Sequence, residues 1–331
     1  MKTEIKTYKN GVTLAVTQMQ GYESVAFNIY VKTGSVNESE GFYGISHYIE
    51  HMLFKGTAKR SAYQIAKELD SLGANVNAYT DCEETTYFTK STNENLEACV
   101  EILSDMFFNS TFDAKEMKRE KKVVCEEIAM YNDDAYSKSE LLVNSILYNG
   151  TNYAKDVAGT KQSVRALTKE NIQKYMKKFY TPQNTIVSFT GNVTLKQAEK
   201  LMEKYFLSVY GLTLKDEVKL NDFVMPKIMK TKIENQTIKL YKDNEQANIC
   251  ISYKALTQYD DKKHALNVLS NALGRGMSSK LFQRIREKLG LVYNISSACS
   301  YNVAQGDITI HFATSTKNAP LALKAIREEI D

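Results

Sequence analysis

Residues 44–57 read GISHYIEHMLFKGT, and the rest of the chain is organised around them. Within this stretch, His47, Glu50 and His51 form a His-x-x-Glu-His pentapeptide. Side chains three and four residues apart share one face of an α-helix, so the two imidazoles and the carboxylate are expected to point the same way. Two neutral imidazoles at this spacing can bind a divalent metal ion, and a carboxylate beside them that is not a ligand can act as a base.

A second face of this predicted helix is apolar, with Ile45, Ile49 and Met52 at helical spacing. Separate apolar and polar faces are expected of a helix that lines a cavity. The pattern is short, and a pair of histidines on a helix is often only a surface pair or a hydrogen-bonded core pair. The metal site is favoured here because the chain has 4 histidines and two of them have this spacing. The other two, His264 and His311, are interpreted as ordinary polar residues.

Length and composition are those of a globular protein large enough for two domains: 331 residues, 43% hydrophobic and 25% charged. The 43 basic and 39 acidic residues form no basic block, so a nucleic-acid partner is not expected. No apolar segment is long enough to span a membrane, and the N-terminal residues lack the apolar core of a signal peptide. We therefore expect a cytoplasmic protein without a membrane partner. Its 5 cysteines contain no Cys-x-x-Cys pair and are expected to be reduced thiols.

Local patterns predict a first unit of strands and helices at residues 1–215. Its strands are expected at residues 12–17, 25–33, 75–80, 85–91 and 185–193. Besides the metal-binding helix, its helices are expected at residues 61–72, 93–108, 113–131 (with helical pattern to about 148), 168–178 and 194–208. An irregular charged segment at 216–231 is expected to be a linker.

A similar order of elements recurs in a second unit at residues 232–331. Strands are expected at 238–243, 247–255, 292–302 and 306–315, and helices at 262–274, 280–290 and 320–330. The second unit contains no His-x-x-Glu-His, so only the first is expected to bind a metal ion. The repeat stops in mid-pattern, and we expect either a second unit that is cut short or a sequence that is a fragment.

A catalytic zinc site usually has three protein ligands, so a further ligand is expected outside the pentapeptide. The helix predicted at 113–131 offers Glu120 and Glu127, which lie two helical turns apart on one face. Most charges of this helix fit a solvent-exposed face with i,i+4 ion pairs. Glu127 is different, because its neighbours Val124 and Ile128 suggest partial burial, where an unpaired carboxylate is costly.

Five longer stretches resemble the pitrilysin/insulinase family of zinc peptidases, which includes the mitochondrial processing peptidase and similar bacterial proteins. In family order and over nearly the full length, they are GSVNESEGFYGISHYIEHMLFKGT, GANVNAYTDCEETTYF, FDAKEMKREKKVVCEEIAMYNDD, FYTPQNTIVSFTGNV and GMSSKLFQRIREKLGLVYNISS. The resemblance implies an α+β fold of two related units, each an antiparallel sheet backed by helices, which face each other across a chamber. Family chains of this type normally complete the second unit, whereas this sequence stops short.

The resemblance also implies roles for individual residues of the first unit. His47, His51 and Glu127 resemble the zinc ligands, and the spacing from His51 to Glu127 is typical of the family. Glu50 resembles the base that activates the attacking water. Glu120 resembles a carboxylate that orients a ligand histidine.

Two further pairs resemble residues that contact the substrate. Asn77 and Ala78 resemble the edge strand to which an extended substrate adds as an extra strand. Arg286 and Tyr293 resemble the pair that the second unit contributes to the substrate and to the tetrahedral intermediate. The alternative interpretation of this second pair is structural: an arginine on a charged helix face and a core tyrosine.

Together these features predict a zinc-dependent endopeptidase that acts on peptides or unfolded polypeptide segments. One alternative is a dedicated maturase that trims the leader from one modified peptide. Such an enzyme can work as half of a heterodimer, and for the chain in general a homodimer or a heterodimer with a related subunit is an expectation. A second alternative is a non-catalytic family member that binds peptides or supports an active partner. Non-catalytic members usually lose the motif, whereas this chain keeps every element of it.

Overall fold

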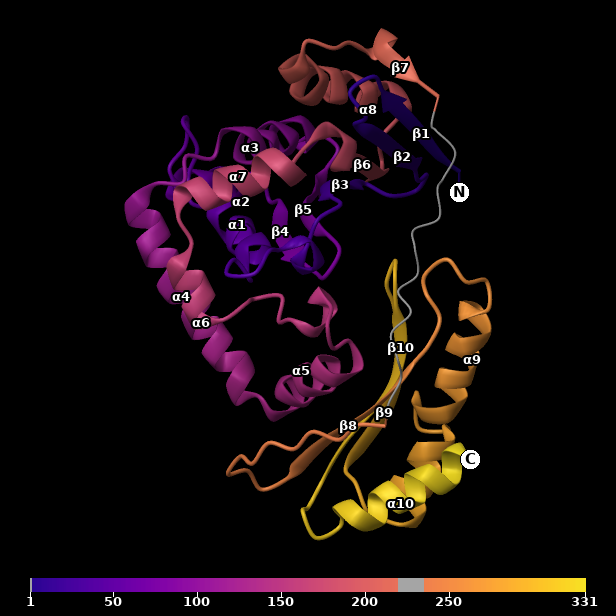
Figure 1. Cartoon of the computed structure of the whole chain (residues 1–331). Coiled ribbons are helices and arrows are strands. Elements are labelled where there is room, and N and C mark those ends of the chain that lie inside the picture. The colour runs from indigo at the N-terminus through magenta and orange to yellow at the C-terminus, as the bar shows by residue number, and fades with distance from the viewer. Residues whose placement is uncertain (1, 220–234) are drawn as a thin grey trace. The chain divides into compact units, whose positions relative to one another are not determined.

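The computed structural model describes residues 2–219 and 235–331, which form two units of sheet and helices (Figure 1). The first unit contains residues up to Ile128 and resumes at Asp156, while residues Ala129–Lys155 join the C-terminal part in the second unit. The chain passes from one unit to the other within helix α4 (Ala114–Asp133). The sequence-based division into 1–215, 216–231 and 232–331 treats each unit as continuous, and most of its linker lies outside the described residues.

The sheet of the first unit has seven strands in the order β4-β5-β3-β6-β2-β1-β7. Their bounds are β1 Thr3–Tyr8, β2 Thr13–Gln18, β3 Ser24–Val31, β4 Asn75–Thr80, β5 Thr85–Thr92, β6 Thr185–Gly191 and β7 Glu217–Val218. Neighbouring strands are antiparallel except β2 and β6. Because β6 lies between β2 and β3, which run in opposite directions, it is necessarily parallel to one of them. The predicted α+β class is confirmed, with one parallel pair inside the expected antiparallel sheet.

Alternation of apolar and polar residues determines which face of this sheet is buried. In β3, every second residue from Val25 to Val31 is buried, and β6 alternates in the same way. The rings of Phe27 and Phe189, from these neighbouring strands, lie 4.9 Å apart between centroids. Helices cover the sheet: α1 packs on β4 and β5, α3 on β5 and β3, and α8 on β2. The helices of this unit are α1 Ile45–Leu53, α2 Ala62–Ser71, α3 Leu96–Asn109, the first part of α4, α6 Lys161–Ala166, α7 Lys169–Phe179 and α8 Leu195–Met202.

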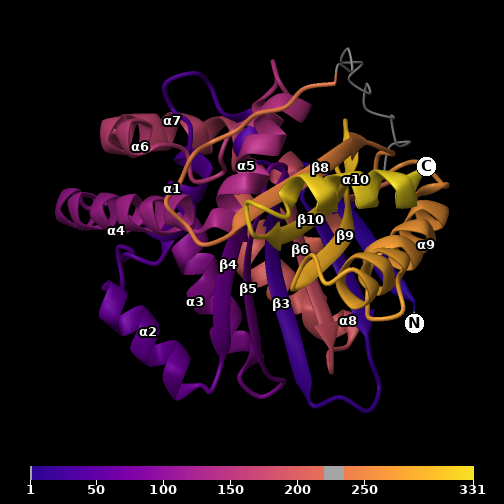
Figure 2. The same ribbon diagram turned by 90° about the horizontal axis from the view of Figure 1, so that it is seen from below.

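The second unit has a three-stranded antiparallel sheet in the order β8-β10-β9. Its elements are α5 Ala135–Leu147, β8 Ala247–Lys254, α9 Lys263–Gly274, the π-helical segment η7 Phe282–Lys288, β9 Asn294–Tyr301, β10 Gly306–Thr314 and α10 Ala319–Ile330. Helix α5 packs on β8, and α9 packs on β9. Read from the other edge, β9-β10-β8 has the same order as β4-β5-β3 of the first unit (Figure 2). The repeat predicted from the sequence is therefore present in the strand topology.

The prediction of a strand at residues 238–243 is wrong. This segment has no regular structure, and Ile238, Leu240 and Tyr241 are exposed. Its side chains alternate as in a strand, but it pairs with no other strand in the part of the chain that the structure describes, and an unpaired strand leaves its backbone groups without partners. The opposite error concerns β1, which was not expected because most of its residues are polar and the segment has little apolar alternation. Among the described residues, no helix is long and apolar enough to span a membrane.

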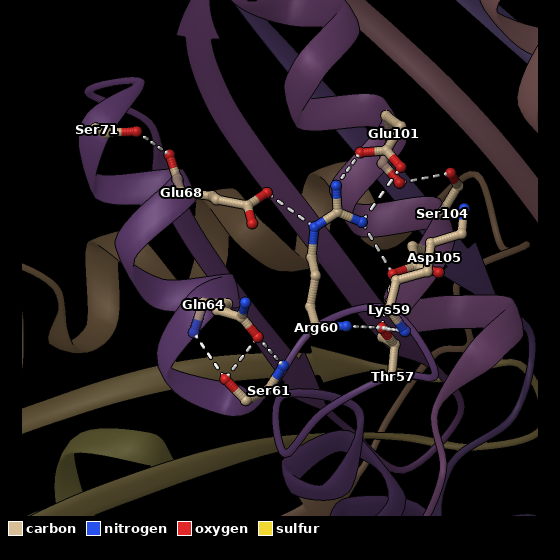
Figure 3. A network of polar contacts seen from close by, with 10 residues as sticks. All are labelled: Thr57, Lys59, Arg60, Ser61, Gln64, Glu68, Ser71, Glu101, Ser104 and Asp105. Atoms are coloured by element: carbon tan, nitrogen blue, oxygen red, sulfur yellow. Dashed lines mark hydrogen bonds and ion pairs between the residues drawn. The ribbon is translucent and has the colours of Figure 1, made fainter.

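Arg60 connects the loop after α1 with helices α2 and α3 (Figure 3). Its guanidinium contacts three carboxylates: Nε lies 2.8 Å from Glu68 Oε2, Nη2 lies 2.5 Å from Glu101 Oε2 and Nη1 lies 3.0 Å from Asp105 Oδ2. Asp105 is buried and also accepts a hydrogen bond from Thr57 Oγ1 at 2.7 Å. A buried carboxylate is tolerated only with such partners, so the network fixes α2 and α3 on the loop that follows α1.

Glu38 caps the N-terminal end of α1. Its Oε2 accepts a hydrogen bond from the Gly44 amide at 2.7 Å, and its Oε1 accepts one from the Ser46 amide at 2.9 Å. Gly44 has the left-handed φ of +89°, and a Cβ there would collide with the carbonyl oxygen of Ala158. Burial raises the pKa of Glu38 to about 7, against the opposite effect of the amide hydrogen bonds. The start of the helix is thus set by a buried carboxyl group and a glycine.

Replacing Arg60 by Met leaves the buried Asp105 carboxylate without its cation. We expect a loss of about 3 kcal/mol in the free energy of unfolding, as is typical when one partner of a buried ion pair is removed. Urea denaturation measures this loss. The matched control is Arg119→Met, because Arg119 pairs with Glu116 but is 75% exposed, and its loss should hardly change stability. Equal effects of the two substitutions would show that the network around Arg60 does not stabilise the fold.

Glu38→Gln tests the pH dependence that the raised pKa implies. Between pH 4.5 and about 7, the folded protein binds more protons at Glu38 than the unfolded chain does. The free energy of unfolding therefore falls as pH rises through this window, and above it Glu38 adds nothing further to the pH dependence. Glutamine does not titrate, so the variant should have a flatter profile in denaturation experiments from pH 5 to pH 8. Identical slopes for wild type and variant would contradict a raised pKa.

Candidate metal centre

Helix α1 places the two histidines and the glutamate of the pentapeptide beside one another, as its spacing predicts. The rings of His47 and His51 are 4.6 Å apart between centroids. Both side chains are mostly buried, with 12% and 20% exposure. The opposite, apolar face of α1 is buried in the core through Ile45, Ile49, Met52 and Leu53. Because this face packs into the core, the histidine face has a fixed direction.

Helix α4 brings Glu127 to the two histidines. Its Oε2 lies 3.7 Å from His47 Nε2 and 3.4 Å from His51 Nε2. One ligand atom from each of the three residues lies within 4.8 Å of the others. These separations exceed normal hydrogen-bond lengths, whereas two ligand atoms of a tetrahedral zinc ion, each at about 2.0–2.2 Å from it, are roughly 3.4 Å apart. Two imidazoles and a carboxylate at these distances fit a divalent metal ion.

The protonation of His47 suits a metal ligand. Burial, together with the neighbouring His51, lowers the pKa of His47 to about 4. The ring is therefore neutral at pH 7, and one of its nitrogens has a lone pair available for a metal ion.

Glu120 orients the second histidine. Its Oε1 is 2.8 Å from His51 Nδ1, and its Oε2 is 2.8 Å from Lys55 Nζ. Burial raises the pKa of Glu120, but the hydrogen bonds from His51 and Lys55 outweigh it and leave the pKa below its ordinary value. Burial lowers the pKa of His51, but the hydrogen bond to Glu120 and the nearby carboxylates outweigh burial, so the pKa lies above its ordinary value. When Nδ1–H donates to the carboxylate, the neutral His51 ring has its lone pair on Nε2, the nitrogen on the side of Glu127. Sequence reasoning missed Lys55, which lies in the turn that follows α1 and contacts Glu120 of another helix.

Glu50 lies beside this group with its carboxylate held by one residue of β4. Its Oε2 accepts a hydrogen bond from Thr80 Oγ1 at 2.5 Å. Burial raises the pKa of Glu50, and the charge of Glu127 acts in the same direction, against the effects of Thr80 and His51. Sequence reasoning did not identify Thr80, because no sequence spacing links a strand residue to a helix residue 30 positions earlier.

Asn77 and Ala78 lie on β4, which is an edge strand of the first sheet. The Asn77 Oδ1 accepts a hydrogen bond from the Ala78 amide at 2.9 Å. This amide therefore points to the open edge of the sheet and not to β5. The expected position at a sheet edge is observed, and the role of the two residues in substrate binding stays a prediction.

Arg286 and Tyr293 lie next to each other within the second unit. The guanidinium carbon of Arg286 is 5.3 Å from the centroid of the Tyr293 ring and 4.5 Å from that of Phe282. Tyr293 is 78% exposed, so its interpretation as a core tyrosine is wrong. This exposure could not be predicted from the sequence, because Tyr293 stands between Val292 and the start of β9. The contribution of the pair to substrate binding stays a prediction.

Comparison with known proteins agrees with this arrangement. A sequence model described as "Insulinase (Peptidase family M16)" matches residues 14–161, and one described as "Peptidase M16 inactive domain" matches residues 166–331. An "uncharacterized zinc protease", YmxG of Bacillus subtilis, is 33% identical over 98% of this chain and 76% of its own length. An "uncharacterized zinc protease" of Rickettsia felis is also 33% identical, over 98% of this chain and 77% of its own length.

Solved structures show the same fold over the whole chain. A peptidase M16 inactive domain from Pseudomonas fluorescens has a TM-score of 0.85 at 18% identity, covering 100% of this chain and 78% of that one. A protease from Helicobacter pylori has a TM-score of 0.83 at 22% identity, covering 98% of this chain and 78% of that one. Fold, sequence models and curated relatives agree, and the chain belongs to the insulinase family of peptidases, family M16.

Proposed function

We propose that this protein is a zinc-dependent endopeptidase that hydrolyses peptide bonds in peptides or unfolded polypeptide segments. The observation that carries the proposal is the convergence of His47, His51 and Glu127 on one point beside the Glu50 carboxylate. The names of the curated relatives, which are zinc proteases, support the choice of metal and of reaction class. A cytoplasmic location, a peptide substrate and a homodimer or heterodimer remain predictions from the sequence.

Each residue of the site then has a defined task. His47, His51 and Glu127 would hold the zinc ion, and Glu120 keeps the His51 ring in the orientation and tautomer that a ligand needs. When bound, zinc would polarise the scissile carbonyl and lower the pKa of the attacking water. Glu50 accepts the proton of that water and delivers it to the leaving amine, a general acid–base contribution worth typically 10²–10⁴-fold in rate.

The edge strand β4 supplies a binding mode for an extended substrate. An added strand would take the Ala78 amide as a hydrogen-bond donor in place of the Asn77 side chain, which now occupies it. Backbone pairing of this kind depends little on substrate sequence, which suits peptides and unfolded segments. A dedicated leader-peptide maturase would use the same residues, and a digest of a diverse peptide library separates it from a general peptidase by the number of peptides cleaved.

The non-catalytic alternative is less well supported. The sequence model described as inactive matches residues 166–331, whereas His47, Glu50, His51 and Glu127 all lie within the other matched segment. The first segment retains the complete donor set and the base. A peptide-binding protein would need no carboxylate at the position of Glu50.

Purified protein should contain one zinc ion per chain, and the two glutamates of α4 should differ in their effect on it. Glu127→Gln removes a ligand and should abolish zinc binding. Glu120→Gln removes only the partner of His51 and should weaken affinity about 10–100-fold. Elemental analysis measures the zinc content of each variant, and competition with a chelator measures its zinc affinity. Glu126→Gln is the control, because Glu126 is exposed. Complete zinc loss in both the Glu120 and Glu127 variants would contradict the ranking.

Glu50→Gln tests the proposed reaction directly. Glutamine fills the same space but cannot accept a proton, so the variant should keep its zinc content and lose at least 10²-fold in turnover of a cleaved library peptide. Turnover and zinc content are measured on the same preparation. A Glu50→Gln protein with turnover near that of the wild type would exclude Glu50 as the base.

A further inference from the structure

We propose that Thr80 is the positioning residue of the base: its hydroxyl fixes the Glu50 carboxylate and couples it to the strand edge that receives the substrate. This inference rests on the proposed endopeptidase function. The contact that carries it is the 2.5 Å hydrogen bond from Thr80 Oγ1 to Glu50 Oε2. Among residues 2–219 and 235–331, no other hydrogen bond holds the Glu50 side chain.

A single hydrogen bond has a large effect on a glutamate side chain. The terminal torsion of Glu is broad, so a carboxylate without a partner samples many orientations. A proton acceptor is effective only when it is held within about 0.5 Å of the productive geometry. Because Thr80 occupies Oε2, the orientation of the carboxylate is fixed while Oε1 stays available to the attacking water.

The position of the Thr80 hydroxyl is determined by the fold and not by Glu50. Thr80 is the last residue of β4, opposite Thr85 in β5, and the turn that follows is closed by a hydrogen bond from the Asp81 amide to the Glu84 carbonyl at 2.8 Å. A Cβ at Gly34 would collide with the Asp81 carbonyl, so the turn lies directly against the backbone after β3. The donor is thus held by the sheet on one side of the base.

The same strand carries the proposed substrate edge. Thr80 and Ala78 are two residues apart in β4, so their side chains share one face and their backbone polar groups point the same way. The Ala78 amide points to the open edge. A substrate strand added there would restrain the residues that hold Thr80, which links substrate binding to the orientation of Glu50.

The alternative to a positioning role is that Thr80 is present only because threonine favours β-strands. A second threonine of the same sheet serves as a control for this alternative. Thr89 lies in the adjacent strand β5, opposite Val76. It is buried, and within the described residues its hydroxyl has no hydrogen-bond partner. Valine at either position keeps the shape and strand propensity of threonine and replaces the hydroxyl by a methyl group.

The test compares Thr80→Val, Thr80→Ser and Thr89→Val in the full chain loaded with zinc, with a cleaved library peptide as substrate. Thr80→Val should lower kcat about 10–100-fold, the range typical when a group that orients a catalytic residue is lost. KM should change less than about twofold, and zinc content and Tm should stay at wild-type values. Thr80→Ser keeps the hydroxyl and should recover kcat to within about threefold of the wild type. Thr89→Val should behave as the wild type.

Three outcomes would overturn the inference. Unchanged kcat in Thr80→Val shows that the hydroxyl does not position Glu50. Equal loss in Thr80→Val and Thr80→Ser shows that a retained hydroxyl does not restore turnover, and so assigns the effect to packing at this position and not to the hydrogen bond. If Thr80→Val loses zinc in proportion to its loss of kcat, the effect on turnover arises at the metal site and not at Glu50. Failure of the proposed function looks different, because zinc-loaded wild-type protein would then cleave no peptide of the library, and this result overturns both proposals.

Discussion

The contact between α1 and α4 is the constraint on which the metal centre depends. Two hydrogen bonds define it: Tyr48 OH donates to the Met117 carbonyl at 2.8 Å, and His51 Nδ1 pairs with Glu120 at 2.8 Å. These two hydrogen bonds set the register of α4 against α1. Once Glu120 lies at His51, the helical repeat places Glu127 two turns further along the same face. The third ligand therefore needs no special loop, only the correct register between two helices.

Buried carboxylates connect elements throughout the first unit. Glu38 bonds the loop before α1 to the first turn of that helix, Asp105 bonds α3 to Arg60, and Glu120 bonds α4 to α1. Each is at most 4% exposed and each has at least two donors. A buried charge is stable only when its partners are in place, so these three groups favour one arrangement of the helices over others with a similar apolar core.

What could be predicted from the sequence follows from periodicity and short spacings. The helix that bears His47 and His51, the alternating strands and the order of the repeat are all properties of neighbouring residues, and the structure has them. Glu127 was a candidate because of its two-turn spacing from Glu120 and its apolar neighbours, and its role as a ligand was implied by the resemblance, since its distance from His51 along the chain is meaningful only within a family. Thr80 and Lys55 were missed because their roles arise from contacts between elements. The prediction of a strand at 238–243 was wrong because alternation shows only that a segment can form a strand. A strand also needs a neighbouring strand with which its backbone can form hydrogen bonds.

The division of the chain within α4 has a consequence for the way the metal centre can be isolated. The first segment of the first unit ends at Ile128 and the first segment of the second unit begins at Ala129, so Glu127 lies one residue before this boundary, in the interior of a continuous helix. Helix ends fray because their last carbonyl groups have no partners inside the helix. A chain cut between the two units would place the third ligand in such a fraying end. Metal binding at the proposed site is therefore expected to require the joined protein, and not only the segments that carry His47, His51 and Glu127.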